Sequence, residues 1–330
     1  MKKSIYVVND GELKRESNTL CLIMAEGKRF IPVEDVSEIH IFGEIDINKR
    51  LLEFLAEKEI ILHFYNHYNY YVGSYYPREH YNSGFMIIKQ AEHYLVAGQR
   101  MKIARAFVNG AARNIRQVLT YYKNRGKELS VTLDHIDSLA ASIDRVGSIE
   151  ELMAIEGNIR ERYYQAFDII IGDPDFTFKE RSRRPPQNQL NALISFGNTL
   201  LYTTALSEIY RTHLDPRIGF LHTSNFRRFS LNLDVAEIFK PIIVDRLIFS
   251  LIGRNMIKKN HFQKKLGGII LNDSGRMLFI KEYEDKIATT IQHRDLGRNV
   301  SYRRLIRMEL YKLEKHLIAE KEYEPFQARW

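Results

Sequence analysis

Short runs in which polar and apolar residues alternate fill the first part of the chain and predict β-strands. The runs SIYVVN, TLCLIMA, KRFIPV and SEIHIF are rich in β-branched residues and are separated by DG, EG and acidic turns. One amphipathic helix is expected at RLLEFLAEKE, followed by a strand at IILHFYN. The tyrosine-rich stretch YNHYNYYVGSYYPREHY could form a hairpin with aromatic residues paired across its strands, or a surface on which nucleic-acid bases stack.

From about Met86 the pattern changes to apolar residues at helical spacing, as in SIEELMAIEGNIRERYYQAF and in the strongly apolar LNALISFGNTLLYTTALSEIYRTH. Ser148 followed by Glu151 is a capping-box signature for the first of these two helices. The sequence therefore predicts an α+β fold. A small β-rich N-terminal domain, residues 1–85, is followed by a large all-α C-terminal domain, residues 86–330.

Composition places the protein among globular chains with a substantial core, because 45% of its 330 residues are hydrophobic. We find no apolar run long enough for a membrane span and no secretory signal near the N-terminus. The single cysteine, Cys21, excludes intrachain disulfides and cysteine-rich zinc sites, which favours a cytoplasmic location.

Charge is unevenly distributed along the chain. Up to Gln90 there are 11 Lys and Arg against 13 Asp and Glu, and after Gln90 there are 38 against 28. Excess positive charge confined to one part of a chain favours a polyanionic partner for that part. The charge alone therefore suggests a polyanionic partner for the helical domain, against the alternative of lysine-rich solvated helical faces.

Candidate metal-binding chemistry is concentrated between Asp215 and Asp245. His222 precedes an acidic pair, Asp234 and Glu237, and a second candidate carboxylate, Glu156, lies in a helix near a buried apolar stripe. One imidazole and two or three carboxylates suit a hard divalent cation that still accepts nitrogen, such as manganese or magnesium. In a basic protein this combination indicates phosphodiester chemistry.

A purely structural interpretation of the same residues is also open. Asp234 could be the N-cap of the helix VAEIFKP, with Glu237 three residues later completing a capping box. His222 could be a histidine hydrogen-bonded at the edge of the core, and Glu156 a solvated side chain. On this interpretation the protein is a non-catalytic scaffold that binds nucleic acid.

Several segments resemble the CRISPR-associated endonuclease/integrase of the adaptation (spacer acquisition) module, the universal "Cas one" family. IEGNIRERYYQAF resembles the family's EG…AR…Y helix, and RPPQNQLNALISFGNTLLY resembles its helix around Asn191 and Ser195. GFLHTSNFRRFSLNLDVAEIFKP matches its G-[FL]-x-H…L-x-x-D-x-x-E-x-F-[RK]-P segment, and YNYYVGSYYPRE and YEPFQARW look like type I variants. Five segments in the family's order make the resemblance specific.

The resemblance implies metal ligands at Glu156, His222 and Glu237, with Asp234 as a nearby acidic residue of the same segment. Some relatives carry aspartate at the position of Glu237, which preserves an oxygen ligand. The implied cofactor is a divalent ion, Mn²⁺ or Mg²⁺. His222 would bind it as the neutral imidazole, so that activity should fall at acid pH.

The implied reaction is phosphoryl transfer on DNA, in which the 3′-hydroxyl of a captured fragment attacks a phosphodiester at the edge of a repeat. The hydrolytic form of this reaction would make the protein a hydrolase acting on phosphodiester bonds. The implied partners are double-stranded and branched DNA, a second copy of the chain joined through the N-terminal domain, and a small ferredoxin-like adaptation protein. A general nuclease for branched DNA repair intermediates is the alternative enzyme.

Basic residues in three segments are candidates for contacts with the DNA backbone, against the alternative of an ordinary solvated basic surface. Arg227 and Arg228 follow His222 closely in the sequence and would lie next to the reacting phosphate. The candidates are Arg183, Arg184, Arg227, Arg228, Lys258, Lys259, Lys264 and Lys265.

Overall fold

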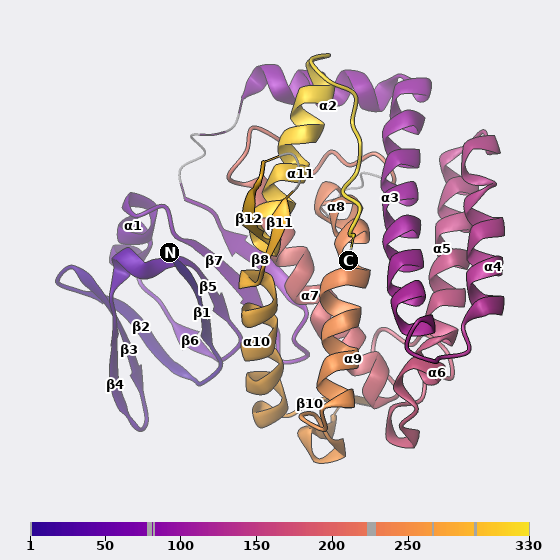
Figure 1. Cartoon of the computed structure of the whole chain (residues 1–330). Helices are drawn as coiled ribbons and strands as arrows, with labels where there is room; N and C mark the ends of the chain where they lie inside the picture. Colours follow the sequence, from indigo (N-terminus) through magenta and orange to yellow (C-terminus); the bar gives the residue numbers. More distant parts are fainter. Residues whose placement is uncertain are drawn as a thin grey trace. The chain divides into compact units, whose positions relative to one another are not determined.

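The described part of the computed structural model covers residues 2–77, 81, 83–222, 229–265, 267–293 and 296–329. It forms two compact units, Met1–His80 and Tyr81–Trp330. Strands dominate the first unit and helices the second (Figure 1). The α+β fold class, with the β-rich part first, is therefore confirmed.

The first unit contains two four-stranded sheets with the orders β1-β5-β7-β8 and β4-β3-β2-β6. All four predicted N-terminal strands, the amphipathic helix and the strand after it are present. Two strands were not predicted. GELKRE has a single apolar residue and no recognisable alternation, and the strand Ile45–Asp46 is only two residues long. The elements are β1 (Lys3–Val7), β2 (Gly11–Glu16), β3 (Thr19–Met24), β4 (Gly27–Ile31), η1 (Val33–Asp35), β5 (Val36–Ile41), β6 (Ile45–Asp46), α1 (Lys49–Glu57), β7 (Ile61–Tyr65) and β8 (Tyr71–Tyr75).

The two faces of the sheet β1-β5-β7-β8 differ in polarity. β1, β5 and β7 are parallel, and β8 returns antiparallel to β7. Ile39 and Leu62 pair on neighbouring strands and belong to the hydrophobic core of this unit. Side chains alternate between faces along a strand. The neighbours of Ile39 and Leu62 along their strands, such as His40 and His63, therefore lie on the opposite face. The β7–β8 hairpin pairs Tyr65 with Tyr71, which confirms the predicted tyrosine hairpin.

The second unit is built from ten helices among the described residues and two short hairpins. The hairpins β9–β10 and β11–β12 interrupt the helical pattern that the sequence predicted for this part. The first of them turns at Gly267, whose φ of +80° suits glycine. The elements are α2 (Gly84–Leu95), α3 (Ala97–Lys123), α4 (Ser130–Ala140), η2 (Ile143–Arg145), α5 (Ile149–Gln165), α6 (Phe167–Ile171), η3 (Pro174–Phe176), α7 (Gln189–Ile209), α8 (Leu231–Lys240), η4 (Pro241–Asp245), α9 (Arg246–Gly253), η5 (Lys259–His261), β9 (Phe262–Lys265), β10 (Gly268–Leu271), α10 (Asp273–Ala288), β11 (Thr290–His293), β12 (Arg298–Ser301) and α11 (Tyr302–Leu317).

Helix α7 is the central helix of this unit, as its apolar composition predicted. It is buried on nearly all sides and packs against α8 and α11. The long helix α3 packs against α4, α5 and α8 (Figure 1). This arrangement brings α5 and α8, the helices that carry Glu156 and Glu237, to the same helical core. None of the helices in the described ranges is long and apolar enough to cross a membrane.

Candidate active site in the helical unit

Glu156 lies on α5, at the edge of the face that this helix buries. The predicted cap is present, because the N–H of Glu151 donates to Ser148 Oγ (3.2 Å) and the Glu151 carboxylate accepts from the N–H of Gly147 (2.9 Å). Ile159 is buried as the sequence predicted, whereas the Glu156 side chain is 19% exposed. Its carboxylate therefore lies between the core and solvent.

His222 is held in place by Asp234, a fully buried residue of α8. Asp234 Oδ2 accepts hydrogen bonds from the N–H groups of Phe220 (2.6 Å) and Leu221 (3.0 Å). Its Oδ1 accepts from the N–H of His222 (2.9 Å) and is hydrogen-bonded to His222 Nδ1 (2.7 Å). A carboxylate on one ring nitrogen fixes the tautomer and leaves Nε2 as the nitrogen that can bind a metal.

Gly219 permits this close approach of the loop to α8. A Cβ atom at this position would lie 2.8 Å from Asp234 Oδ2 and 2.9 Å from Ser230 Oγ. The N–H of Gly219 donates to the same Ser230 hydroxyl (2.8 Å), which attaches the loop to the start of α8. Any larger residue at 219 would push the loop, and with it His222, away from Asp234.

The alternative interpretation of Asp234 as a helix N-cap is wrong. Helix α8 begins one turn earlier, at Leu231, and Asp234 lies inside it. The cap position is Ser230, which makes no side-chain capping bond to the helix. Neither Asp234 nor Glu237 acts as part of a capping box, because the first holds the loop of His222 and the second binds two cations.

Glu237 is buried on α8 between Arg160 and Lys240. Arg160 Nη2 donates to Glu237 Oε2 (2.6 Å), and Lys240 Nζ donates to Glu237 Oε1. The same guanidinium lies 3.7 Å from Glu156 Oε1 and 3.8 Å from Asp245 Oδ2. Arg160 is thus the common neighbour of three carboxylates that come from α5, α8 and η4.

Negative charge exceeds positive charge in this buried cluster, with three carboxylates against the two cations Arg160 and Lys240. Burial, and after it the charge of Glu237, raise the pKa of Glu156. Burial alone would raise the pKa of Glu237, but Lys240 and Arg160 outweigh burial and hold it well below the usual range. Burial raises the pKa of Asp245 to about 7, although Arg160 opposes the shift. A further cation would relieve the unfavourable ionisation of Glu156 and Asp245.

The three predicted ligands belong to one electrostatic cluster. Glu237 and His222 both act on the pKa of Glu156, and Glu237 acts on that of His222. Their ligand atoms do not all lie within 4.8 Å of one another, since among the described residues only Glu38, His40 and His63 meet that condition. Both oxygens of Glu237 are instead engaged by Arg160 and Lys240. The donor set fits a divalent ion in chemistry and charge, and coordination by these three residues stays a prediction.

Sequence reasoning missed Arg160 and Lys240, although a local signal for both was present. Arg160 follows Glu156 by four positions and Lys240 follows Glu237 by three, the spacings that place side chains together on one helix face. Basic residues on otherwise buried helices require acidic partners. Arg181 was missed as well, and it donates to Asn191 Oδ1 (2.8 Å) and Ser195 Oγ (3.0 Å).

Six of the eight predicted DNA-contacting residues are described, all of them exposed, and they lie on two adjacent segments. The N–H of Ile269 donates to Pro186 O (2.8 Å), and Gln187 Nε2 donates to Gly267 O (3.3 Å). These bonds attach the segment after Arg184 to the β9–β10 hairpin. The exposed residues of this basic surface are Arg183, Arg184, Lys258, Lys259, Lys264 and Lys265. Arg227 and Arg228 lie outside the described residues.

Together, a β-rich unit and a helical unit in which a partly exposed histidine is held by a buried carboxylate define a class of α+β proteins. Comparison with known proteins identifies the family within this class. The family model described as CRISPR associated protein Cas1 matches residues 5–285. The chain belongs to the Cas1 family, which confirms the resemblance seen in the sequence.

Relatives of this chain match it over nearly its whole length. The CRISPR-associated endonuclease Cas1 2 of Thermodesulfovibrio yellowstonii is 60% identical over 330 residues, which is 100% of both chains. The CRISPR-associated endonuclease Cas1 of Thermotoga maritima is 50% identical over 321 residues, covering 97% of this chain and 98% of that one. The solved structure of a CAS1 protein from Thermotoga maritima has a TM-score of 0.89 at 49% identity, and the match covers 98% of this chain and 99% of that one.

More distant solved structures share the fold. A casposase bound to integration product has a TM-score of 0.88 at 19% identity, covering 99% of this chain and 93% of that one. A Cas6-RT-Cas1–Cas2 complex contains a chain with a TM-score of 0.86 at 17% identity, and the match covers 100% of this chain and 36% of that one. The architecture therefore persists where little of the sequence is shared.

Proposed function

We propose that this chain is a metal-dependent DNA endonuclease/integrase that inserts DNA fragments, as spacers, into a CRISPR repeat array. The observation that carries the proposal is the buried cluster in which Asp234 orients His222 beside the carboxylates of Glu156 and Glu237. Relatives named as CRISPR-associated endonucleases and a casposase of the same fold bound to integration product support DNA as the substrate. In the reaction the 3′-hydroxyl of the fragment attacks a phosphodiester of the repeat. A new P–O bond forms as the bond from phosphorus to the 3′-oxygen of the target strand breaks, and that oxygen leaves as a 3′-hydroxyl.

In this proposal Glu156, His222 and Glu237 hold Mn²⁺ or Mg²⁺, which would neutralise phosphoryl charge and help to align the reacting oxygens. Arg160 and Lys240 keep Glu237 ionised, so that it presents oxygen without first losing a proton. Asp234 keeps His222 in the tautomer that exposes Nε2.

The test is a strand-joining assay with a DNA fragment and a repeat-bearing plasmid, with manganese or magnesium supplied or removed by chelator. We expect joining at the repeat boundary with the metal and loss of joining with the chelator, and re-addition of the ion should restore it. Cutting of branched DNA without insertion at the boundary would favour a general repair nuclease. Joining that continues in chelator would contradict the metal dependence.

The basic surface formed by segment 183–184 and the β9–β10 hairpin is proposed to contact the DNA backbone. The double variants Arg183→Gln/Arg184→Gln and Lys264→Gln/Lys265→Gln should each weaken binding to DNA of any sequence. Each should also reduce the slope of log affinity against log salt by about 2, since each removes two phosphate contacts. Fluorescence anisotropy over a salt series measures both effects.

A matched control for these variants is Lys49→Gln/Arg50→Gln, two exposed basic residues at the start of α1 in the β-rich unit. This double variant should retain the parental affinity and salt slope. Equal losses in the control and the test variants would mean that net charge, and not this surface, determines binding.

The proposed partners are a second copy of the chain, joined through the β-rich unit, and a small ferredoxin-like adaptation protein. The solved Cas6-RT-Cas1–Cas2 complex supports assembly with Cas2. The nearly neutral charge of the first 90 residues suits contact with protein, whereas the excess of basic residues after them suits contact with DNA. We place the reaction in the cytoplasm, where the buried thiol of Cys21 stays reduced.

A further inference from the structure

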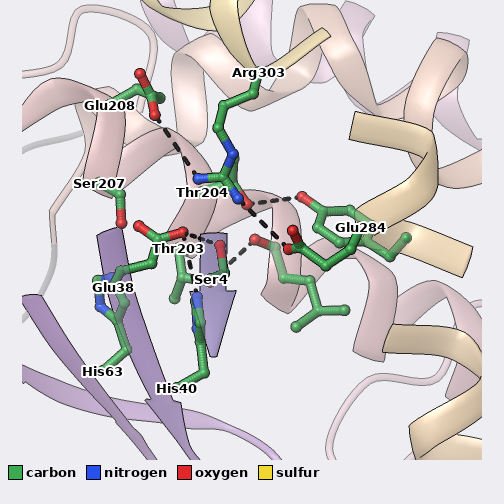
Figure 2. A network of polar contacts seen from close by, with 12 residues as sticks. Ser4, Glu38, His40, His63, Thr203, Thr204, Ser207, Glu208, Glu284 and Arg303 are labelled. Atoms are coloured by element: carbon green, nitrogen blue, oxygen red, sulfur yellow. Dashed lines mark hydrogen bonds and ion pairs between the residues drawn. The ribbon is translucent and has the colours of Figure 1, made fainter. Parts of the chain in front are cut away.

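A second group of metal-binding side chains lies in the β-rich unit, on the polar face of the sheet β1-β5-β7-β8. Glu38 and His40 are two positions apart on β5 and therefore point to the same face. His63 on β7 is the direct partner of His40 in the parallel pair. Figure 2 shows the three side chains projecting from neighbouring strands, with Ser4 of β1 beside them.

Burial and spacing of this Glu38–His40–His63 cluster fit a metal ion. One ligand atom from each residue lies within 4.8 Å of the other two. All three side chains are at most 1% exposed. One carboxylate oxygen and two imidazole nitrogens form the donor set that zinc and other first-row divalent ions accept in proteins. Zinc usually takes four ligands, so three from the protein leave one coordination position for a further donor.

Each imidazole is hydrogen-bonded through Nδ1 to a hydroxyl group outside the proposed ligand set, as is usual for a histidine that binds a metal through Nε2. His40 Nδ1 is hydrogen-bonded to Tyr65 Oη (2.8 Å), and His63 Nδ1 is hydrogen-bonded to Ser74 Oγ (2.7 Å). Ser4 Oγ donates to Glu38 Oε1 (2.8 Å). Each hydroxyl can accept the N–H of Nδ1, and in that tautomer Nε2 carries the lone pair and is the ligand atom.

His40 Nε2 provides an independent indication that a ligand is needed here. This buried nitrogen makes no hydrogen bond to any of the residues that the structure describes. Its nearest charged neighbour is Glu38 Oε1 at 3.5 Å, which is too far for a good hydrogen bond. An unpaired buried nitrogen is unfavourable, and a bound cation would remove that cost by accepting its lone pair.

We propose that Glu38, His40 and His63 bind a zinc-like divalent ion whose role is to join β5 to β7. This ion is distinct from the one proposed for catalysis, because its ligands come from the β-rich unit alone and are buried. A structural ion at this place would offset the free-energy cost of burying these polar side chains in a small unit. Its binding energy would contribute directly to the stability of that unit.

The experiment is zinc binding to the full-length chain after dialysis against EDTA, with bound metal measured by mass spectrometry after equilibrium dialysis. The parent should bind one more equivalent of zinc per chain than His40→Gln. His67→Gln replaces an exposed histidine of the same unit and should bind zinc as the parent does. His222→Ala should keep the equivalent that His40→Gln loses, which separates this ion from the catalytic one.

Tyr65→Phe tests the site with little risk to folding. It removes only the hydroxyl that orients His40 and should lower the affinity for zinc about 10- to 100-fold. Zinc should raise the Tm of the parent and of His67→Gln, and this rise should be absent in His40→Gln.

Equal zinc binding by the parent and His40→Gln would overturn the proposal, as would parental zinc affinity in Tyr65→Phe. If His40→Gln does not fold, cobalt added to the His222→Ala chain decides the question. Absorption bands of a cobalt–histidine site are expected there, and their absence would also overturn the proposal.

Discussion

Glu156→Gln and His222→Ala should each reduce strand joining by more than about 100-fold. Loss of an outer residue that only orients a metal ligand typically costs about 10- to 100-fold, so loss of a ligand itself should cost more. Glu156→Gln keeps the shape of the side chain and removes its charge, and His222→Ala removes the imidazole that Asp234 holds. Initial rates of joining at saturating manganese measure the effect.

Each of these variants has a matched control in the same unit. Glu161 is an exposed carboxylate on the same helix as Glu156, and His135 is an exposed histidine on α4. Glu161→Gln and His135→Ala should join DNA at the parental rate. Parental activity in Glu156→Gln and His222→Ala would mean that these residues hold no catalytic ion. Absence of metal-dependent joining in the parent itself would favour the non-catalytic scaffold.

Asp234→Ala should lower the free energy of unfolding by about 3–5 kcal/mol and should abolish joining. The carboxylate is fully buried and accepts from three consecutive backbone N–H groups and from His222. Each buried donor that loses its acceptor costs about 1–3 kcal/mol. Urea unfolding followed by circular dichroism gives the change in stability. Asp134→Ala, at an exposed position on α4, should change it by less than about 0.5 kcal/mol.

Asp234→Asn removes the charge of this residue and keeps its shape. We expect the effect to be visible in the pH dependence of joining. Burial lowers the pKa of His222, but the hydrogen bond and charge of Asp234 outweigh burial and raise it above its ordinary value. A metal needs the neutral imidazole, so activity should fall as the pH drops through this raised pKa. Without the negative charge the pKa falls, and the acid limb of the pH–rate profile should move to lower pH. An unmoved acid limb would mean that another group controls it.

The fold class could be predicted because it depends on local patterns. Apolar alternation identified β1, β3, β4 and β5, and apolar residues at helical spacing identified α5 and α7. Strand β2 could not be found in this way, since only Leu13 of its six residues is a large apolar side chain. The hairpin β9–β10 was missed for a similar reason. Its first strand, FQKK, reads as a solvated basic segment.

The candidate site was only partly predictable, because its charges are balanced by residues far apart in the sequence. Glu156 and Glu237 followed from the resemblance to the family. That Arg160 pairs with Glu237, 77 positions away, depends on the packing of α5 near α8. Asp234 was ambiguous because an acidic residue before an apolar helical run is also a good N-cap. The start of α8 at Leu231 and the position of the segment 219–222 together distinguish the two roles.

Asp234 attaches the segment 219–222 to α8 through the N–H groups of Phe220, Leu221 and His222. His222 is bonded to Asp234, which lies on the same helix as Glu237, so α8 positions both residues. Glu156 lies on a different helix, α5, and is linked to Glu237 through the guanidinium of Arg160. The distance from Glu156 to this pair therefore depends on the packing of α5 near α8, and Arg160 contacts a carboxylate of each helix.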